Sequence, residues 1–157
     1  MKKTFVAVLI IASVSLAVPA KAQAELLSLN FGFITDSKFS FDPFLWTAGM
    51  TIDIPIGPVL TLCPEGYLVV NKFDFGAFIF APAVMLNFNA AGFFVGAGLS
   101  KWFLLGSDVS GAPSTDISLK LNAGFHIPGM RLTAFLFTPF KDAFKSTAVG
   151  ATLGFAF

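Results

Sequence analysis

Strict two-residue alternation is the feature of this sequence that most limits its possible folds. In "TDISLKLNAGFHI", residues 115–127, every second residue from Ile117 onward is apolar or alanine, and the residues between are polar or small. Successive side chains of a β-strand point to opposite faces, whereas apolar positions on a helix recur every three or four residues. The same alternation occurs in "LSLNFGF" (27–33), "FLWTAGMTIDI" (44–54) and "VGATLGFAF" (149–157). The pattern therefore predicts strands with one apolar face.

The composition indicates what covers those apolar faces. The chain is 55% hydrophobic and only 12% charged, its mean hydropathy is +0.80, and it has 21 phenylalanines but one tyrosine. A soluble domain rarely exposes so much apolar surface, so we expect lipid to cover it. Hydrocarbon admits only helices and closed barrels. A spanning helix over residues 75–100 would contain a proline, two asparagines and four glycines. A soluble sandwich or lipocalin-like barrel would expose a face that is too small and polar.

The N-terminal residues 1–24 have the pattern of a secretory signal peptide. They combine two lysines, an apolar run from Thr4 to Val18 and small residues at an A-x-A site, which predicts cleavage after Ala22 or Ala24. The remaining 133 residues, 25–157, suit one domain. Because three of the ten basic residues leave with the leader, seven remain against nine acidic residues, which argues against a nucleic-acid partner. A single cysteine, Cys63, provides no internal disulfide.

Turn-forming sequences divide residues 25–157 into eight strands. We expect these at 26–35, 44–54, 59–70, 73–88, 92–104, 115–127, 130–140 and 146–157. The connections "PIGP" (55–58), "NFNAAG" (87–92) and "IPGM" (127–130) are short and uncharged. The connections "TDSKFSFD", "NKFD", "GSDVSGAPS" and "FKDAFKS" carry most of the charge, and all but "NKFD" are longer. Short turns at one end and polar loops at the other are typical of outer-membrane barrels. The prediction is an all-β, eight-stranded antiparallel transmembrane β-barrel of the bacterial outer-membrane type.

The order of several short motifs resembles a known family. "GMTIDIPIGPVLTLCPE" (49–65), "FFVGAGLSKWFLL" (93–105) and "VGATLGFAF" (149–157) are similar to the outer-membrane β-barrel domain family of small porin-like proteins, the OmpA- and OmpX-like eight-stranded barrels. This resemblance implies export through the periplasm to the bacterial outer membrane and a structural or interaction role. The partners it implies are outer-membrane lipid and lipopolysaccharide, with periplasmic chaperones and the barrel assembly machinery during biogenesis.

Charged residues within the strands are expected to face the lumen. A charge facing lipid near the bilayer midplane costs about 2–4 kcal/mol, and an eight-stranded barrel is just wide enough for its own side chains to fill it. Strand parity places Asp53, Glu65, Lys120 and Arg131 inside, and predicts the ion pairs Glu65 with Lys120 and Asp53 with Arg131. Asp116 and His126 have the same inward parity. We expect this luminal polar cluster to fill the barrel; its alternative role is a gate.

The sequence offers little for catalysis. There is one histidine, His126, beside the "IPGM" turn, and no G-x-S-x-G motif occurs. One histidine and one cysteine cannot form a metal-ligand cluster. We therefore expect neither an enzyme nor a cofactor. The alternative to a structural role is a small-solute or lipid-handling barrel, with a narrow pore or a lipid-transport function.

Two further sets of residues concern the membrane. Trp46 and Phe44 are expected at the lipid interface near the longer loops, as in an aromatic girdle. Parity turns Trp102 inward and Lys101 outward. The C-terminal residues Leu153, Phe155 and Phe157 form the lipid-facing side of a closing strand, and the terminal aromatic resembles the signal that the outer-membrane assembly machinery recognises.

Overall fold

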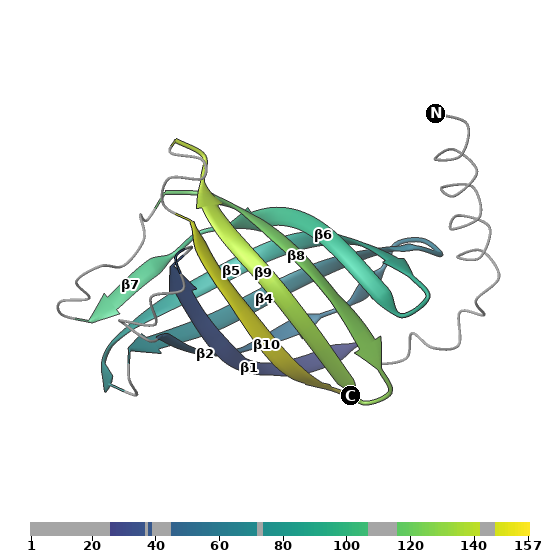
Figure 1. Cartoon of the computed structure of the whole chain (residues 1–157), viewed down its shortest axis with the longest axis horizontal. Helices are drawn as coiled ribbons and strands as arrows, with labels where there is room; N and C mark the ends of the chain where they lie inside the picture. The colour runs from purple at the N-terminus through teal and green to yellow at the C-terminus, as the bar shows by residue number, and fades with distance from the viewer. Residues whose placement is uncertain (1–25, 37, 39–44, 72–73, 107–115, 142–146) are drawn as a thin grey trace.

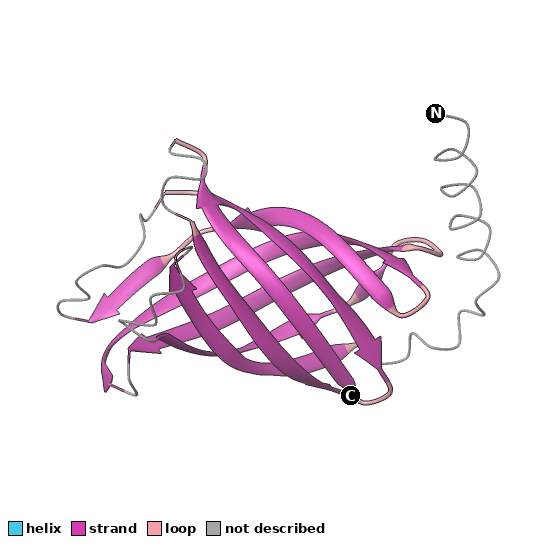
Figure 2. Cartoon of the chain, in the orientation of Figure 1, coloured by secondary structure: helices cyan, strands magenta, loops and turns pink. Residues whose placement is uncertain are grey.

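The computed structural model describes residues 26–36, 38, 45–71, 74–106, 116–141 and 147–157 (Figure 1). The expected signal peptide (1–24) and Phe44 lie outside the described residues. All regular secondary structure in the described part of the chain is β-strand (Figure 2). The strands are β1 (Leu27–Asp36), β2 (Leu45–Ile52), β3 (Ile54–Pro55), β4 (Leu60–Asn71), β5 (Asp74–Ala90), β6 (Phe93–Ser100), β7 (Phe103–Gly106), β8 (Ser118–Ile127), β9 (Met130–Pro139) and β10 (Ala148–Ala156).

The sheet closes on itself into a barrel. Neighbouring strands pair antiparallel around the sheet, and β1 pairs with β10 to complete the cylinder. β2 and β3 form one barrel strand interrupted at Asp53, since both pair with β4. β6 and β7 form another, interrupted at Lys101 and Trp102, since both pair with β5. The structure therefore confirms the predicted closed, eight-stranded antiparallel barrel. No helix among the described residues is long and apolar enough to cross a bilayer.

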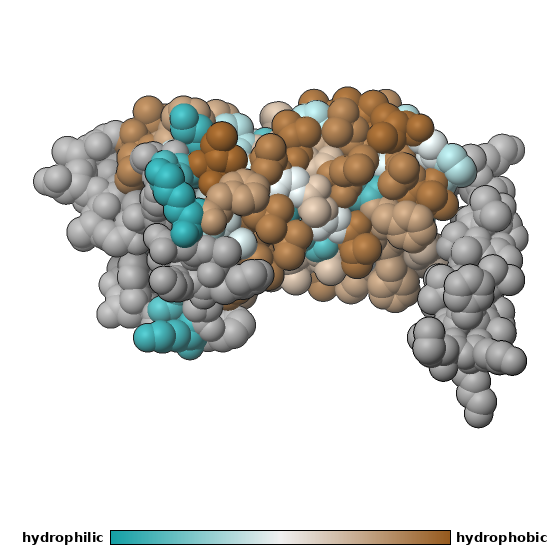
Figure 3. Space-filling model, turned by 90° about the horizontal axis from the view of Figure 1, so that it is seen from above, coloured by the Kyte–Doolittle hydropathy of each residue, from teal (hydrophilic) through white to brown (hydrophobic). Residues whose placement is uncertain are grey.

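Alternation along the strands separates an apolar exterior from a polar and aromatic interior. On β4, for example, Cys63, Glu65 and Tyr67 are buried, whereas Leu60 and Leu68 are exposed. Apolar side chains cover much of the outer surface in Figure 3. Successive side chains of a strand point to opposite faces. A register that places one charged side chain inside the barrel therefore also decides, for all the remaining side chains of that strand, whether they face the lumen or the outside.

The hairpin between β5 and β6 corrects one predicted boundary. The sequence predicts that the strand ends at residue 88 and that a turn spans 87–92, but β5 continues to Ala90 and the turn is confined to Ala91 and Gly92, with φ of 51° and 84°. Positive φ at both central residues is the requirement of a type I′ hairpin turn. Asn89 remains in the ladder because its N–H donates to Val59 O (2.7 Å) and its Nδ2 donates to Thr61 Oγ1 (2.8 Å). Asn89 is therefore a strand residue, although the preference of asparagine for turns led to the prediction of a turn at this position.

Backbone hydrogen bonds hold the C-terminal residue in place. Phe157 N–H donates to Leu27 O (2.8 Å), and Leu27 N–H donates to Phe157 O (3.4 Å). Ala156 N–H donates to Gly129 O (3.0 Å) in the neighbouring turn. The last residue is therefore bonded at the seam where the barrel closes.

Candidate functional site

The barrel interior brings together the residues of the predicted luminal polar cluster. Glu65 on β4 and Lys120 on β8 reach across the lumen, and Lys120 Nζ donates a hydrogen bond to Glu65 Oε2. Each side chain is only 1% exposed. Burying a charge without a partner costs free energy of folding. The Glu65 carboxylate and the Lys120 ammonium group each offset part of that cost for the other.

Aromatic rings surround the Lys120 ammonium group. Its Nζ lies 4.5 Å from the ring centroid of Tyr67, 5.0 Å from that of Phe135 and 5.2 Å from that of Phe137. A cation within about 6 Å of an aromatic face is attracted by the ring quadrupole, most strongly when water is excluded. Lys120 is therefore held by one carboxylate and three rings.

These rings belong to an aromatic cluster, which we define as Tyr67, Trp102, Phe135 and Phe137. Trp102 meets Phe137 edge-on at 5.1 Å, and Phe137 meets Phe135 at 5.4 Å. All four side chains are at most 5% exposed. Trp102 lies between β6 and β7, and Phe137 lies near the loop end of β9, so the cluster occupies the lumen on the loop side of the Glu65–Lys120 pair.

The second predicted pair lies toward the short turns. Arg131 Nη1 donates to both carboxylate oxygens of Asp53, at 2.9 and 2.8 Å, and Nε donates to Thr133 Oγ1 at 3.3 Å. The guanidinium group also stacks on Phe94, 4.4 Å from its ring centroid. Arg131 therefore pairs its charge with Asp53, donates hydrogen bonds to Asp53 and Thr133, and packs the flat face of its guanidinium group on Phe94.

A buried thiol extends this pair into a small network. Cys63 Sγ donates to Asp53 Oδ1 (2.9 Å) and accepts from Asn87 Nδ2 (3.1 Å). Cys63 is fully buried and free. The chain Arg131–Asp53–Cys63–Asn87 thus joins β9, the gap between β2 and β3, β4 and β5 across the turn-side half of the lumen.

Glycine provides the space that the luminal aromatic rings occupy. A Cβ on Gly124 would lie 2.5 Å from Phe94 Cζ, and a Cβ on Gly150 would lie 2.6 Å from Phe135 Cε2. Either distance is shorter than van der Waals contact. These two rings can lie across the strands only because the facing positions have no side chain.

Two titratable residues with inward parity are not in the luminal cluster. Asp116 was expected inside, but it precedes β8, its side chain is 49% exposed, and its Oδ2 lies 3.2 Å from Lys141 Nζ. The prediction was wrong because strand parity ends where the strand ends. His126 is half-buried at the turn end, where its ring meets Phe94 edge-on at 5.0 Å.

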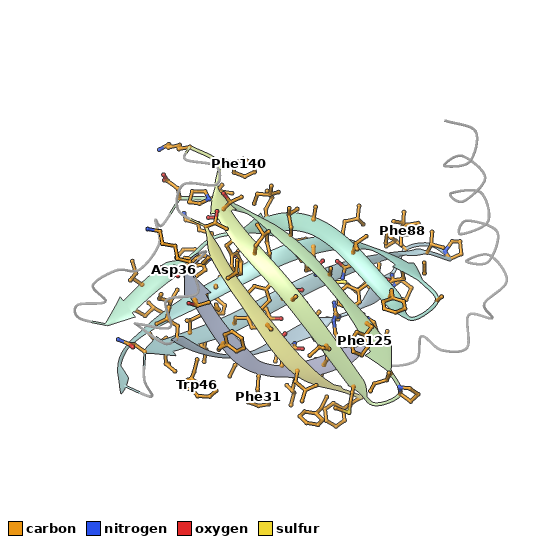
Figure 4. All side chains as sticks on the ribbon, viewed as in Figure 1. Phe31, Asp36, Trp46, Phe88, Phe125 and Phe140 are labelled. Carbon is orange, nitrogen blue, oxygen red and sulfur yellow. The ribbon has the colours of Figure 1, made fainter. Side chains whose placement is uncertain are left out.

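The two tryptophans lie on opposite sides of the barrel wall. Trp46 projects outward (Figure 4) and is 37% exposed, whereas Trp102 is inward and 1% exposed. Lys101 is exposed, and its Nζ lies 5.3 Å from the ring centroid of Phe103. Of the C-terminal set, Leu153, Phe155 and Phe157 are all exposed.

Sequence reasoning did not identify the inward rings of Tyr67, Phe135 and Phe137. Strand parity could have identified two of them, because Phe135 and Phe137 are four and six residues after Arg131 and so lie on the same face of β9 as Arg131. The outward residues of β9 are also apolar, so hydropathy shows no contrast there. In the described part of the chain, no group of three or more histidine, cysteine or acidic residues is placed to hold a metal ion.

Comparison with solved structures places this architecture among transmembrane barrels. No protein-family model and no curated protein sequence matches the chain. The solution structure of the de novo designed TMB2.3 matches with a TM-score of 0.53 and 11% identity, covering 84% of this chain and 94% of that one. The crystal structure of the N-terminal β-barrel domain of Pseudomonas aeruginosa OprF matches with a TM-score of 0.50 and 13% identity, covering 83% and 96%. This chain has their fold.

Proposed function

We propose that this protein is an integral barrel of the bacterial outer membrane with a structural or interaction role, a side-chain-filled lumen and no catalytic activity. The observation that carries the proposal is the buried Glu65–Lys120 pair beneath the aromatic cluster, which joins opposite walls of the barrel. An eight-stranded barrel has little interior beyond the volume of its own side chains.

The exterior supports placement in a membrane. Large apolar side chains on both halves of the barrel are exposed, including Phe31, Val84 and Leu132. The fold is shared with an outer-membrane protein domain and with a designed transmembrane barrel. We assign the short turns and both chain ends to the periplasmic side and the longer loops to the outside, which is the usual arrangement of such barrels. Outer-membrane lipid and lipopolysaccharide are then its permanent surroundings.

Two layers of side chains support a closed lumen. The Asp53–Arg131 pair with its Cys63 network forms the turn-side layer, and Lys120 with the aromatic cluster forms the loop-side layer. An ion following the barrel axis would have to displace a buried charge pair and then pass between desolvated rings. Each step is costly in a low-dielectric interior.

Single-channel recording in planar bilayers tests the closed lumen. The wild-type chain is expected to give no stepwise current. The double variant Trp102→Ala with Phe137→Ala removes two of the four rings of the aromatic cluster and is expected to give measurable current steps. Leu132→Ala is the matched control because it removes an exposed, outward side chain. Stable current steps from the wild-type chain would contradict the proposal and favour a narrow small-solute pore.

A further inference from the structure

The turn end of the barrel has an exposed apolar surface that the luminal cluster does not explain. The six side chains of this surface lie beside the three short turns and are between 36% and 65% exposed. We call them the turn rim: Ile54, Ile56, Leu60, Phe88, Phe93 and Ile127. Phe88 projects outward at this end in Figure 4. Large exposed apolar patches usually mark a surface that contacts lipid or a partner.

The turn rim continues the outer wall of the barrel. Ile54 and Ile56 extend the outward alternation of Met50 and Ile52, which are exposed on β2. Phe88 extends the outward alternation of β5 as far as its turn. The apolar exterior therefore reaches the turns and does not end before them.

The sequence around the short turns has no charged side chains. Residues 54–64, 84–100 and 121–130 include no aspartate, glutamate, lysine or arginine. The nearest charges, Asp53 and Arg131, pair with each other inside the lumen. A protein partner that recognises charge would therefore find no charged side chain to bind on the turn rim.

The backbone of the turns is also largely prevented from exposing hydrogen-bond donors. Pro55, Pro58 and Pro128 have no N–H group. Three hydrogen bonds close or brace the turns: Ile56 N–H to Leu60 O (3.0 Å), His126 N–H to Gly92 O (2.7 Å) and Ala156 N–H to Gly129 O (3.0 Å). Irregular backbone exposed to lipid does not occur within the hydrocarbon core. Turns braced in this way suit the boundary between acyl chains and headgroups.

Strand length places the turn rim near the far boundary of the bilayer. Exposed charges at the loop end include Asp36 on β1 and Lys141 after β9. Leu27 lies nine residues before Asp36, and Met130 lies eleven residues before Lys141. At about 3.4 Å per residue and a tilt of roughly 40°, the turn ends of these strands are about 23–29 Å below those charges. The apolar band of such barrels is about 25 Å tall.

We infer that the turn rim is seated in the periplasmic leaflet, at the boundary between the acyl chains and the headgroups of its glycerophospholipids. This inference rests on the membrane placement proposed above. Because the turn rim has no charged side chain, its seating does not depend on the charge of the headgroups. Any interaction role of the assembled protein then falls to the loop end, where the exposed charges lie.

Spin-label accessibility in phosphatidylcholine nanodiscs tests the inference, because both membrane faces are open to the solution there. A nitroxide is attached to Gly57→Cys at the tip of a short turn, where nothing lies within 4 Å of an added Cβ. Cys63 is fully buried and does not compete for the label. Val84→Cys on the outer wall and Lys38→Cys at the loop end are the controls, because both positions are exposed.

Collisions with oxygen, which concentrates in lipid, and with a neutral nickel chelate, which stays in water, report the surroundings of each label. The label at Gly57→Cys is expected to collide with nickel severalfold less often than the label at Lys38→Cys. Its oxygen collision rate is expected to lie between those of the two controls. Nickel collisions as frequent as at Lys38→Cys would overturn the inference, because the turn would lie in water. Low rates with both reagents would also overturn it, because another protein chain would then cover the turn.

A variant of the turn rim tests what seats the turn. Ile54→Ser with Ile56→Ser, made in the labelled Gly57→Cys chain, is expected to raise the nickel collision rate toward the Lys38→Cys value. Leu99→Ser is the matched control, because Leu99 is a 52%-exposed side chain outside the turn rim. An unchanged rate in the double variant, or an equal rise in Leu99→Ser, would overturn the role of the turn rim. Replacing part of the phosphatidylcholine with phosphatidylglycerol is expected to change neither collision rate, and a clear change would contradict seating independent of headgroup charge.

The label at Val84→Cys separates failure of this inference from failure of the proposed function. Low oxygen collision at Val84→Cys would contradict the membrane barrel itself. High oxygen collision there, with water-like rates at Gly57→Cys, would contradict the turn-rim inference alone. Heat-modifiable gel mobility shows that each labelled variant is folded, and Ile56→Cys provides a second label position if Gly57→Cys does not fold.

Discussion

Arg131 holds both carboxylate oxygens of Asp53 through one guanidinium nitrogen, at 2.9 and 2.8 Å. Asp53 is the single residue between β2 and β3, so the pair joins an interruption in one barrel strand to the wall formed by β9. The Asp53 side chain is 17% exposed, whereas Arg131 is 2% exposed. Water therefore reaches one member of this pair, but not the Glu65–Lys120 pair deeper in the lumen, where both side chains are 1% exposed.

Glu65→Gln is expected to destabilise the barrel by about 3–5 kcal/mol. The substitution leaves the Lys120 ammonium group buried without a counter-charge, and breaking a buried pair from one side has a cost of this size. Urea unfolding in detergent micelles, followed by heat-modifiable mobility, measures the change. The double variant Glu65→Gln with Lys120→Met removes both charges and is expected to recover most of the loss. A loss under about 1 kcal/mol in the single variant would show that the pair is not isolated from water.

Asp53→Asn is expected to cost less, roughly 1–3 kcal/mol, because water at the turn end can solvate Arg131 in part. The same unfolding experiment gives the comparison, and the ranking of the two single variants is the quantity of interest. Equal losses would mean that both levels of the lumen are equally dry.

Much of this interior could be predicted because charge and parity agree within single strands. Lys120 lies in an unbroken alternation, so its inward direction followed from the sequence. The inward direction of Arg131 followed from strand parity together with the cost of a charge that faces lipid. The rings around Lys120 did not, because β9 is apolar on both faces. Asp116 was misplaced because parity does not extend beyond the first bonded residue of β8.

Gly124→Ala is expected to destabilise the barrel by about 1–3 kcal/mol or to prevent folding, as overpacking does elsewhere. The added Cβ would lie 2.0 Å from Leu132 O and 2.5 Å from Phe94 Cζ, so both the backbone of β9 and the ring under Arg131 would have to move. Gly57→Ala is the control, since nothing lies within 4 Å of a Cβ built there. Comparable unfolding midpoints for the two variants would contradict the tight fit of Phe94 against β8.

The two tryptophans are expected to respond differently to lipid. Trp102→Phe leaves Trp46, whose fluorescence is expected to be strongly quenched by brominated acyl chains because its side chain is exposed on the outer wall. Trp46→Phe leaves Trp102, which is 1% exposed inside the lumen and is expected to be quenched little by lipid. Strong lipid quenching of Trp102 would place the aromatic cluster outside the barrel.

Deleting Phe157 is expected to impair assembly in the cell while leaving synthesis and export intact. The deletion removes the N–H donated to Leu27 O at 2.8 Å and the 69%-exposed ring at the closing seam. Phe157→Leu keeps the backbone hydrogen bonds and removes only the aromatic ring. Comparing the two variants therefore shows whether assembly depends on the aromatic ring or on the backbone hydrogen bonds at the seam. Both variants are compared by the fraction of heat-modifiable protein in outer-membrane preparations and by the amount of processed chain in the periplasm.

Refolding into detergent micelles completes that test, because no assembly machinery is present there. The remaining β1–β10 pairs, from Ser28 with Ala156 to Asp36 with Ala148, are unchanged by the deletion. We therefore expect near-normal refolding of both variants in micelles. If the deletion variant also fails to refold in micelles, its cellular defect reflects barrel closure. If it reaches the outer membrane at the wild-type level, Phe157 carries no assembly signal.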